Sequence, residues 1–273
     1  MSCTQRSAQA KFQVGTSGYM IGKKRWTKLP CLNCIEINSS FYRLPSQKLI
    51  TALSKLPKNV NVVMKAWRYL THIKRLKDPE LGWEPFWEAI EPLGSKLACV
   101  LVQLPPSFAN TETNVERLVE LRKIVPNGLR VAVEFRNASW LVDSTYDLFK
   151  SFGWTVVGTL IIKKSNSKWV GTMPPGLYMP PVTARYNYLR IHGKRGWKGE
   201  LSEQELLKIR RALGKSGTTH SFVMFNNTFF DKRSQTCRVK DMDLNSAAVC
   251  NAVQFTDLLG KTRTRRLRYT SEN

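Results

Sequence analysis

Histidine is scarce in this chain of 273 residues, which has only His72, His192 and His220. Catalytic zinc clusters need many histidine and acidic ligands, so we expect no multi-zinc site, while a single divalent ion held by two carboxylates stays open. The HExxH and GxSxG signatures are absent, and GTSG at 15–18 is not followed by the lysine and the serine or threonine of a phosphate-binding loop. These absences exclude the enzyme classes that depend on those motifs.

The sequence also lacks a long apolar run, and its first residues, MSCTQRSAQAKF, have no hydrophobic core of a secretory signal. We therefore expect no membrane association and an intracellular location, cytoplasmic or, in a eukaryote, nuclear. Six cysteines are too few for a disulfide-dense scaffold. The single CxxC, at Cys31 and Cys34, leads into a strand rather than following one, so it predicts neither a zinc site nor a redox site.

Acidic residues are few relative to basic ones, with 20 Asp and Glu against 43 Lys and Arg, and the formal net charge is +23. Residues 161–240 hold 16 basic and 4 acidic side chains. A charge of this size favours a polyanionic partner such as nucleic acid. The alternative is a charged surface that serves solubility, because net charge carries no information about the fold.

Apolar, β-rich runs recur along the chain, and helical patterns separate most of them. The eight runs cover 12–17, 34–38, 61–66, 98–104, 131–136, 154–162, 186–192 and 221–226. The helical patterns cover 46–56, 112–124, 202–213 and 245–260. Alternating strands and helices are typical of βα units around a parallel sheet. Eight such units predict an α/β fold, a single TIM-type (β/α)8 barrel.

The expected domain organisation is simple. Residues 12–260 form the barrel domain, preceded by an extension at 1–11 and followed by a basic tail at 261–273. The barrel is expected to be irregular around residues 162–185, because that segment has four prolines and no clear amphipathic helix.

Polar residues interrupt the apolar strands in a regular way. In VAVEFR at 131–136, Glu134 and Arg136 share one face of the strand. The outer face of a barrel strand contacts helices and must be apolar, so we expect the polar face to point inward. The inward set is Glu36, Asn38, Lys65, Gln103, Glu134, Arg136, Arg190, His192 and Asn226. Nearly all lie near the carboxyl-terminal end of a strand, where barrel enzymes build their active sites.

The composition of this set suggests roles for its members. Three cations outnumber two carboxylates, which predicts an anion-binding pocket. In an enzyme, a glutamate would act as the general base and the histidine as the acid, while the cations stabilise developing charge. The catalytic candidates are Glu134, Glu36 and His192. The candidates for binding substrate or anion are Arg136, Arg190, Lys65, Asn38, Gln103, Asn226 and His72. A buried structural network of paired charges is the alternative, and His72 could equally be an ordinary histidine at a loop edge.

Several longer motifs resemble the YecE-like family, domain of unknown function 72. They are GTSG (15–18), EINSSFYRLPS (36–46), LVQLPPSF (101–108), VEFRNASW (133–140), YLRIHG (188–193) and FNN (225–227). The resemblance implies a TIM-type barrel and no settled activity. The family usually has His-Pro where this chain has Asn137 and Ala138, and its sixth strand usually ends near an aspartate that VVGTLII lacks.

Three functions stay open at this point. The first is a nucleic-acid-associated protein with a cationic pocket, acting as a hydrolase of phosphoester bonds. The second is an enzyme that acts on a small anionic or sugar-like metabolite. The third is a DNA- or RNA-binding protein without catalysis, in which the inward network is structural. The sequence predicts no oligomeric state.

Overall fold

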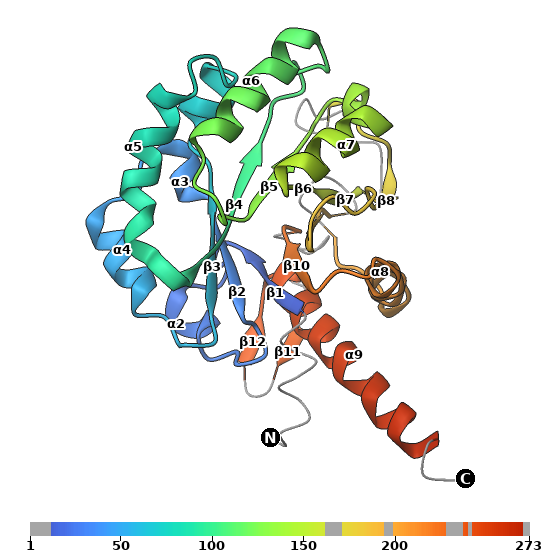
Figure 1. The fold of residues 1–273 in the computed structure, drawn as a ribbon. Helices are drawn as coiled ribbons and strands as arrows, with labels where there is room; N and C mark the ends of the chain where they lie inside the picture. The colour runs from blue at the N-terminus through green and yellow to red at the C-terminus, as the bar shows by residue number, and fades with distance from the viewer. Residues whose placement is uncertain (1–11, 162–170, 194–198, 228–236, 240–241, 270–273) are drawn as a thin grey trace.

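The computed structural model describes residues 12–161, 171–193, 199–227, 237–239 and 242–269 (Figure 1). Ten strands form one sheet in the order β6-β5-β4-β3-β2-β1-β10-β9-β7-β8. They are β1 (Phe12–Ser17), β2 (Cys34–Ile37), β3 (Asn61–Lys65), β4 (Leu97–Gln103), β5 (Val131–Glu134), β6 (Thr155–Val156), β7 (Gly158–Ile161), β8 (Gly176–Tyr178), β9 (Tyr186–Ile191) and β10 (His220–Phe225). Every pairing is parallel except that of β7 with β8. The predicted α/β class is confirmed as a curled, mostly parallel half-barrel.

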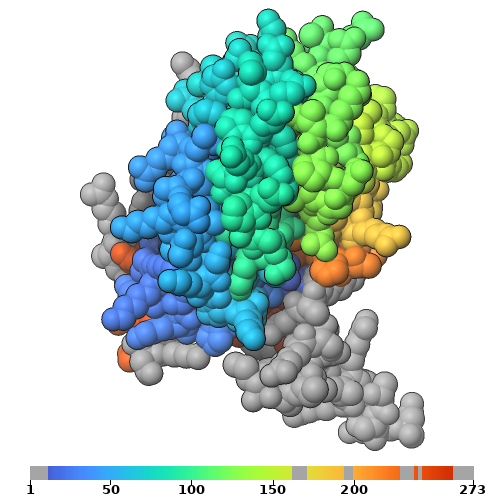
Figure 2. Space-filling view, turned by 60° about the vertical axis from the view of Figure 1, so that its left-hand side comes forward, coloured from blue at the N-terminus to red at the C-terminus, as the bar shows by residue number. Residues whose placement is uncertain are grey.

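Helices surround this sheet (Figure 1). The α-helices are α2 (Lys23–Trp26), α3 (Ser39–Tyr42), α4 (Gln47–Ser54), α5 (Glu80–Ile90), α6 (Glu112–Ile124), α7 (Asp143–Phe152), α8 (Glu203–Lys215) and α9 (Ala247–Tyr269). Shorter turns are the π-helical η1 (Tyr69–Ile73) and the 3₁₀ segments η2 (Glu91–Lys96) and η3 (Ala138–Trp140). Figure 2 shows blue, teal and green atoms from the first half of the chain covering most of one face of the molecule.

Serine caps start two of these helices. The Ser46 hydroxyl accepts a hydrogen bond from the Leu49 amide at the start of α4 (3.3 Å). Ser202 and Glu205 form a capping box at the start of α8. Such caps satisfy amide groups that the first helical turn leaves without partners, which is why the helices begin at these residues.

The eight predicted strands all form, but the sixth is divided. β6 pairs with β5, whereas β7 pairs with β9. Val157 lies between the two and donates its amide hydrogen to the Val133 carbonyl (2.9 Å). Part of the segment expected to be irregular forms β8, and residues 162–170 of that segment lie outside the described residues. Helix α9 continues to Tyr269, beyond the helical pattern that ends at residue 260.

Two apolar layers flank the strands. One lies inside the curl of the sheet and includes Val63, Leu101, Ala132 and Met224. The larger one lies between the sheet and the helices. Side chains alternate between the two faces of a strand, so β2, β3, β4, β5, β9 and β10 contribute to both layers. The inner layer fills the curl and leaves the polar residues at the ends of the strands.

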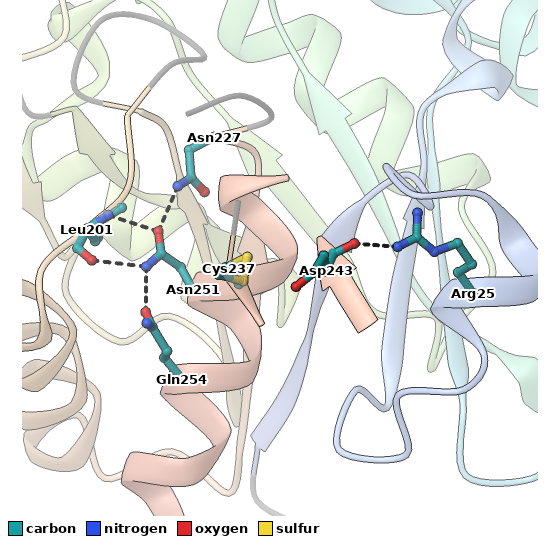
Figure 3. The surroundings of a disulfide bond; sticks show 8 residues. Arg25, Leu201, Asn227, Cys237, Asp243, Asn251 and Gln254 are labelled. Atoms are coloured by element: carbon teal, nitrogen blue, oxygen red, sulfur yellow. Dashed lines mark hydrogen bonds between the residues drawn. A yellow bond between two sulfur atoms is a disulfide. The ribbon is translucent and has the colours of Figure 1, made fainter. Parts of the chain in front are cut away.

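A disulfide and an asparagine anchor the last helix (Figure 3). Cys237 on β11 (Cys237–Val239) is bonded to Cys250 on α9, and β11 pairs with β12 (Met242–Leu244). The adjacent Asn251 accepts hydrogen bonds from the Leu201 amide and the Asn227 side chain, both at 2.9 Å. Its amide group donates to the Leu201 carbonyl and to Gln254. The start of α9 therefore holds both the hairpin and the segment that precedes α8. In the described part of the chain, no helix combines the length and apolar character that a membrane span requires.

Candidate functional site

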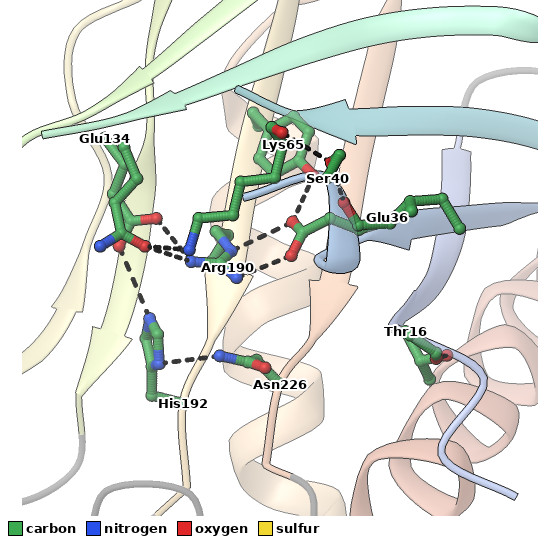
Figure 4. Close-up of polar contacts among 12 residues, drawn as sticks. Thr16, Glu36, Ser40, Lys65, Glu134, Arg190, His192 and Asn226 are labelled. Atoms are coloured by element: carbon green, nitrogen blue, oxygen red, sulfur yellow. Dashed lines mark hydrogen bonds and ion pairs between the residues drawn. The ribbon is translucent and has the colours of Figure 1, made fainter. Parts of the chain in front are cut away.

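Arg190 lies at the centre of a buried polar network at the carboxyl-terminal edge of the sheet. Its Nη2 and Nε donate to the two carboxylate oxygens of Glu36, at 2.6 and 3.1 Å. Its Nη1 donates to Glu134 Oε2 at 2.7 Å and lies 3.4 Å from Gln103 Oε1. Figure 4 shows Glu36 and Glu134 on opposite sides of Arg190. One guanidinium therefore neutralises charge on two strands that are not neighbours.

Strand register explains why these residues meet. Gln103 pairs directly with Glu134 across β4 and β5, and each ends its strand. Parallel strands end at a common edge, and residues two positions apart share a face. The expected inward direction of Glu36, Gln103, Glu134 and Arg190 is thus what the structure has.

Arg136 and His192 extend the network beyond Glu134. Arg136 Nη2 forms an ion pair with Glu134 Oε1 and lies 3.4 Å from His192 Nε2. Asn226 Nδ2 lies 3.5 Å from the other ring nitrogen of His192. The side chain of Arg136 is buried, and its Nε has no hydrogen-bond partner within the described residues. That nitrogen is a charged donor with unused capacity.

The two carboxylates are ionised at neutral pH. Burial alone would raise the pKa of Glu134, but the guanidinium groups of Arg136 and Arg190 hold it well below its usual range. Burial also opposes the ionisation of Glu36, and Arg190 together with the Tyr188 hydroxyl lowers the pKa of that carboxyl. Both groups are therefore charged but already occupied, so neither is a ready general base.

His192 is neutral at the same pH. Burial and the nearby Arg136 lower its pKa to about 4, despite the opposing hydrogen bond to Glu134. Its Nε2 lies 3.4 Å from Arg136 Nη2 and 3.8 Å from Glu134 Oε1. The predicted role of His192 as an acid would thus begin from the neutral ring.

Lys65 differs from the other cations of the site. Its Nζ donates to Gln103 Oε1 at 2.9 Å and lies 4.2 Å from the centre of the Phe41 ring. Burial and the charge of Arg190 lower its pKa to about 7, although Glu134 and Glu36 act in the opposite direction. Lys65 is half-buried, whereas Arg190 is 2% exposed. Lys65 as a residue is thus more exposed than Arg190, while its amine is desolvated enough to lower the pKa.

His72 lies beside Lys65 on the π-helical turn η1. Its ring is 4.8 Å from that of Phe41, and its Nδ1 is 3.0 Å from the Thr71 hydroxyl. Burial and the cations around it, Lys65 first among them, lower the pKa of His72 to about 4. The next residue after Phe41 is Tyr42, which is 74% exposed and contacts the Phe41 ring edge-on.

The structure does not join Asn38 to the network. Asn38 lies between β2 and α3, its carbonyl accepts from the Phe41 amide, and its side-chain oxygen is buried with no hydrogen-bond partner in the described chain. Tyr188 is not among the residues predicted for the site, yet its hydroxyl donates to Glu36 Oε2 at 2.7 Å. The alternation in YNYLRIH places Tyr188 on the same face as Arg190, which was the available signal.

The two departures from the family pattern have local structural accounts. Asn137 caps η3 by accepting from the Ser139 amide (3.1 Å), and it donates to the Pro106 carbonyl (2.9 Å). On the sixth strand, Thr159 pairs in register with Arg190 and is buried, with no hydrogen-bond partner for its hydroxyl among the described side chains and backbone. A hydroxyl therefore lies on the strand where the family pattern expects a carboxylate.

Residues 171–172 cover the end of β5. The Thr172 amide donates to the Arg136 carbonyl (3.2 Å), and the Thr172 hydroxyl accepts from the Ala138 amide (2.8 Å). Gly171 has a positive φ of 63°, and a Cβ there would lie 1.8 Å from the Arg136 carbonyl oxygen. Only glycine fits this contact.

A metal centre finds no support in the described residues, which contain no group of three or more His, Cys, Asp or Glu side chains arranged to hold an ion. The two carboxylates of the site are bound to arginine instead. A single ion on Glu36 and Glu134 would have to displace Arg190.

Residues 29–271 match the family model described as "Protein of unknown function DUF72". The chain belongs to this family. The resemblance noted in the motifs is thus confirmed. The crystal structure of a DUF72 family protein from Enterococcus faecalis V583 superposes on this chain with a TM-score of 0.72. The two sequences are 21% identical, and the match covers 92% of this chain and 98% of that one. A DUF72 family protein from Thermotoga maritima MSB8 is 27% identical, with a TM-score of 0.71 and coverage of 92% and 99%. No curated protein matches the chain.

Proposed function

We propose that this DUF72 protein is an enzyme that binds a small ligand carrying a phosphate or carboxylate group at the carboxyl-terminal edge of its sheet. The observation that carries the proposal is the unused Nε of the buried Arg136. A buried charged donor without a partner costs free energy, which an anionic ligand would recover. Purely structural networks seldom leave such a donor without a partner.

The division of the site into a floor and a mouth supports the same proposal. Arg190, Glu36 and Glu134 are buried and bind one another, so they fix the shape of the floor. Lys65 and His72 are half-buried, and we call these two residues the mouth of the site. Because Lys65 has a pKa of about 7, it is better matched to proton transfer at neutral pH than either carboxylate. Lys65 is the acid–base group of this proposal, and the carboxylates hold the cations.

Calorimetric titration of the full chain with inorganic phosphate and with acetate at low ionic strength tests this function. We expect Arg136→Gln to weaken binding at least about tenfold, since a hydrogen bond to a charged group contributes about 1.5–3 kcal/mol. Lys65→Met, at a half-buried position, tests the same site if Arg136→Gln does not fold. Lys58→Gln removes an exposed lysine outside the site and serves as the matched control. Absence of binding to the unaltered protein, or equal losses in Lys58→Gln, would overturn the proposal.

Nucleic acid is the second candidate ligand, and the observation that favours it is the net charge of +23. A phosphodiester could enter the same pocket, in which case the enzyme would be a hydrolase acting on phosphoester bonds. Binding should then weaken steeply with salt, because phosphate contacts release counterions. The test is titration of duplex DNA and single-stranded RNA between low and moderate salt, beside a control protein of equal charge. Equal binding by the control would remove nucleic acid from consideration.

We also infer that the curled sheet is a closed barrel of the TIM type in which residues 155–161 serve as one strand. The pairing of β6 with β5 and of β7 with β9 supports this, because the single residue Val157 separates β6 from β7. The position of the polar network at the carboxyl-terminal edge agrees with where such barrels place their sites.

A further inference from the structure

We propose that Lys65 is a nucleophile that captures the carbonyl group of a small aldehyde or ketone as an imine. The carbonyl compound would carry a carboxylate or phosphate, and in this respect the inference rests on the proposed anion-binding function. The amine chemistry itself follows from the surroundings of Lys65 alone.

The first ground is the position of the amine. Lys65 ends β3, and the Ser40 hydroxyl donates to its carbonyl (2.6 Å), which fixes the backbone. The ring of Phe41 and the amide of Gln103 hold Nζ in place. Lys65 as a whole residue is half-buried, whereas Arg190, Glu36 and Glu134 are buried, so Lys65 is the residue among them that solvent partly reaches.

The second ground is the absence of a counterion. Within the described residues Lys65 forms no ion pair, since the carboxylates of Glu36 and Glu134 bind arginine. Its one hydrogen bond to a side chain goes to a neutral amide. A lysine that only bound anions would need its charge, whereas a desolvated amine near other cations loses a proton and becomes nucleophilic.

The charges that face Lys65 agree with this reading. Burial comes first, and Arg190 and Arg136 disfavour the charged amine, while Glu134 and Glu36 favour it. His72, whose ring lies 4.8 Å from that of Phe41, is neutral at the same pH. With a pKa of about 7, a substantial fraction of the amine is unprotonated in neutral solution.

The chemical step is balanced without any further reagent. The nitrogen lone pair adds to the carbonyl carbon, and a proton passes from nitrogen to the oxygen to give a carbinolamine. The hydroxyl group then takes up the remaining nitrogen proton and leaves as water, while the nitrogen lone pair forms the carbon–nitrogen double bond. A neutral imidazole such as that of His72 can accept and return the proton in this exchange. The anionic group of the substrate would bind the free Nε of Arg136.

Reductive trapping tests the inference. The full chain is incubated with glyoxylate and, separately, with uncharged acetaldehyde at pH 7 in the presence of cyanoborohydride, which reduces imines to stable amines. Peptide mass mapping then locates the modified lysines. We expect Lys65 to be labelled about tenfold or more over the exposed Lys58, because only a neutral amine attacks a carbonyl. Labelling should fall to half near pH 7 as the solution is acidified.

The variants separate chemistry from folding. Lys65→Arg keeps the charge and removes the amine, so its labelling at this site should vanish while its thermal melt stays cooperative. Lys58→Arg should leave the labelling of Lys65 unchanged. Labelling of Lys65 by acetaldehyde but not glyoxylate would support the nucleophile and overturn the anionic substrate class. Labelling of Lys65 no greater than that of Lys58 would overturn the inference, even if phosphate binds as proposed.

Discussion

Arg190 binds Glu36 side-on, with two nitrogens 2.6 and 3.1 Å from the two carboxylate oxygens, although the residues lie on strands separated by β1 and β10. The pair is buried, so its charges have no water to replace a lost partner. The stability of the fold should therefore depend on a contact between side chains of the candidate site.

Replacement of Glu36 by glutamine should destabilise the protein by about 3–5 kcal/mol, because it leaves a buried guanidinium with one carboxylate instead of two. Urea unfolding followed by circular dichroism measures the change. The control is Glu120→Gln, which breaks the exposed ion pair with Lys123 and should cost less than about 1 kcal/mol. Equal losses in the two variants would contradict the prediction.

Acid should unfold the protein partly through Glu134. Its pKa lies well below the ordinary 4.5, so its contribution to stability is complete above that value and is lost as the pH falls toward the lower folded-state value. In Glu134→Gln this contribution is missing at every pH. The difference in unfolding free energy between the two proteins should thus shrink as the pH falls below about 4.5, and a constant difference would speak against it.

Lys65 should show the opposite pH dependence to that of an ordinary ion-paired lysine. Its folded-state pKa is about 7 against 10.5, so between these values the unfolded chain binds more protons and stability rises with pH. Relative to Lys65→Met, the unaltered protein should gain on the order of 1–3 kcal/mol between pH 7 and pH 10. Lys58→Met provides the baseline for an exposed lysine. A flat difference for Lys65→Met would show that the amine is charged in the folded state.

The Cys237–Cys250 disulfide should stabilise the chain measurably. The two cysteines are 13 residues apart. Closing a loop of this length removes entropy from the unfolded chain and is worth about 2–3 kcal/mol. Dithiothreitol should lower the midpoint of thermal unfolding, and the Cys237→Ser, Cys250→Ser double variant should start from the lower midpoint. If dithiothreitol lowered the unfolding midpoint of the double variant as well, the effect of the reductant would not come from this disulfide.

Much of the fold could be predicted because buried parallel strands are short, apolar and β-branched, and runs such as NVVMK are easily recognised. β8 could not be predicted in the same way. Gly176 to Tyr178 lie among four prolines, and their strand conformation comes from antiparallel pairing with β7 rather than from local preference.

The site was predictable as far as alternation extends along a strand. Glu36, Gln103 and Glu134 lie on regular strands, so their direction follows from the period of two. Asn38 lies beyond the end of its strand, because α3 begins at Ser39, so the alternation does not set the direction of its side chain. The lowered pKa of Lys65 and the binding of both Glu36 and Glu134 by Arg190 depend on distances across the curled sheet. The spacing of residues along the sequence does not contain these distances.

The contact of Gly171 with the Arg136 carbonyl has an evolutionary consequence. Any side chain at position 171 would push against the main chain that carries Arg136, and so would move the guanidinium on which the candidate site depends. Selection on the pocket would therefore act on a residue that contributes no functional group to it. Drift at position 171 should be as restricted as drift at Arg136 itself.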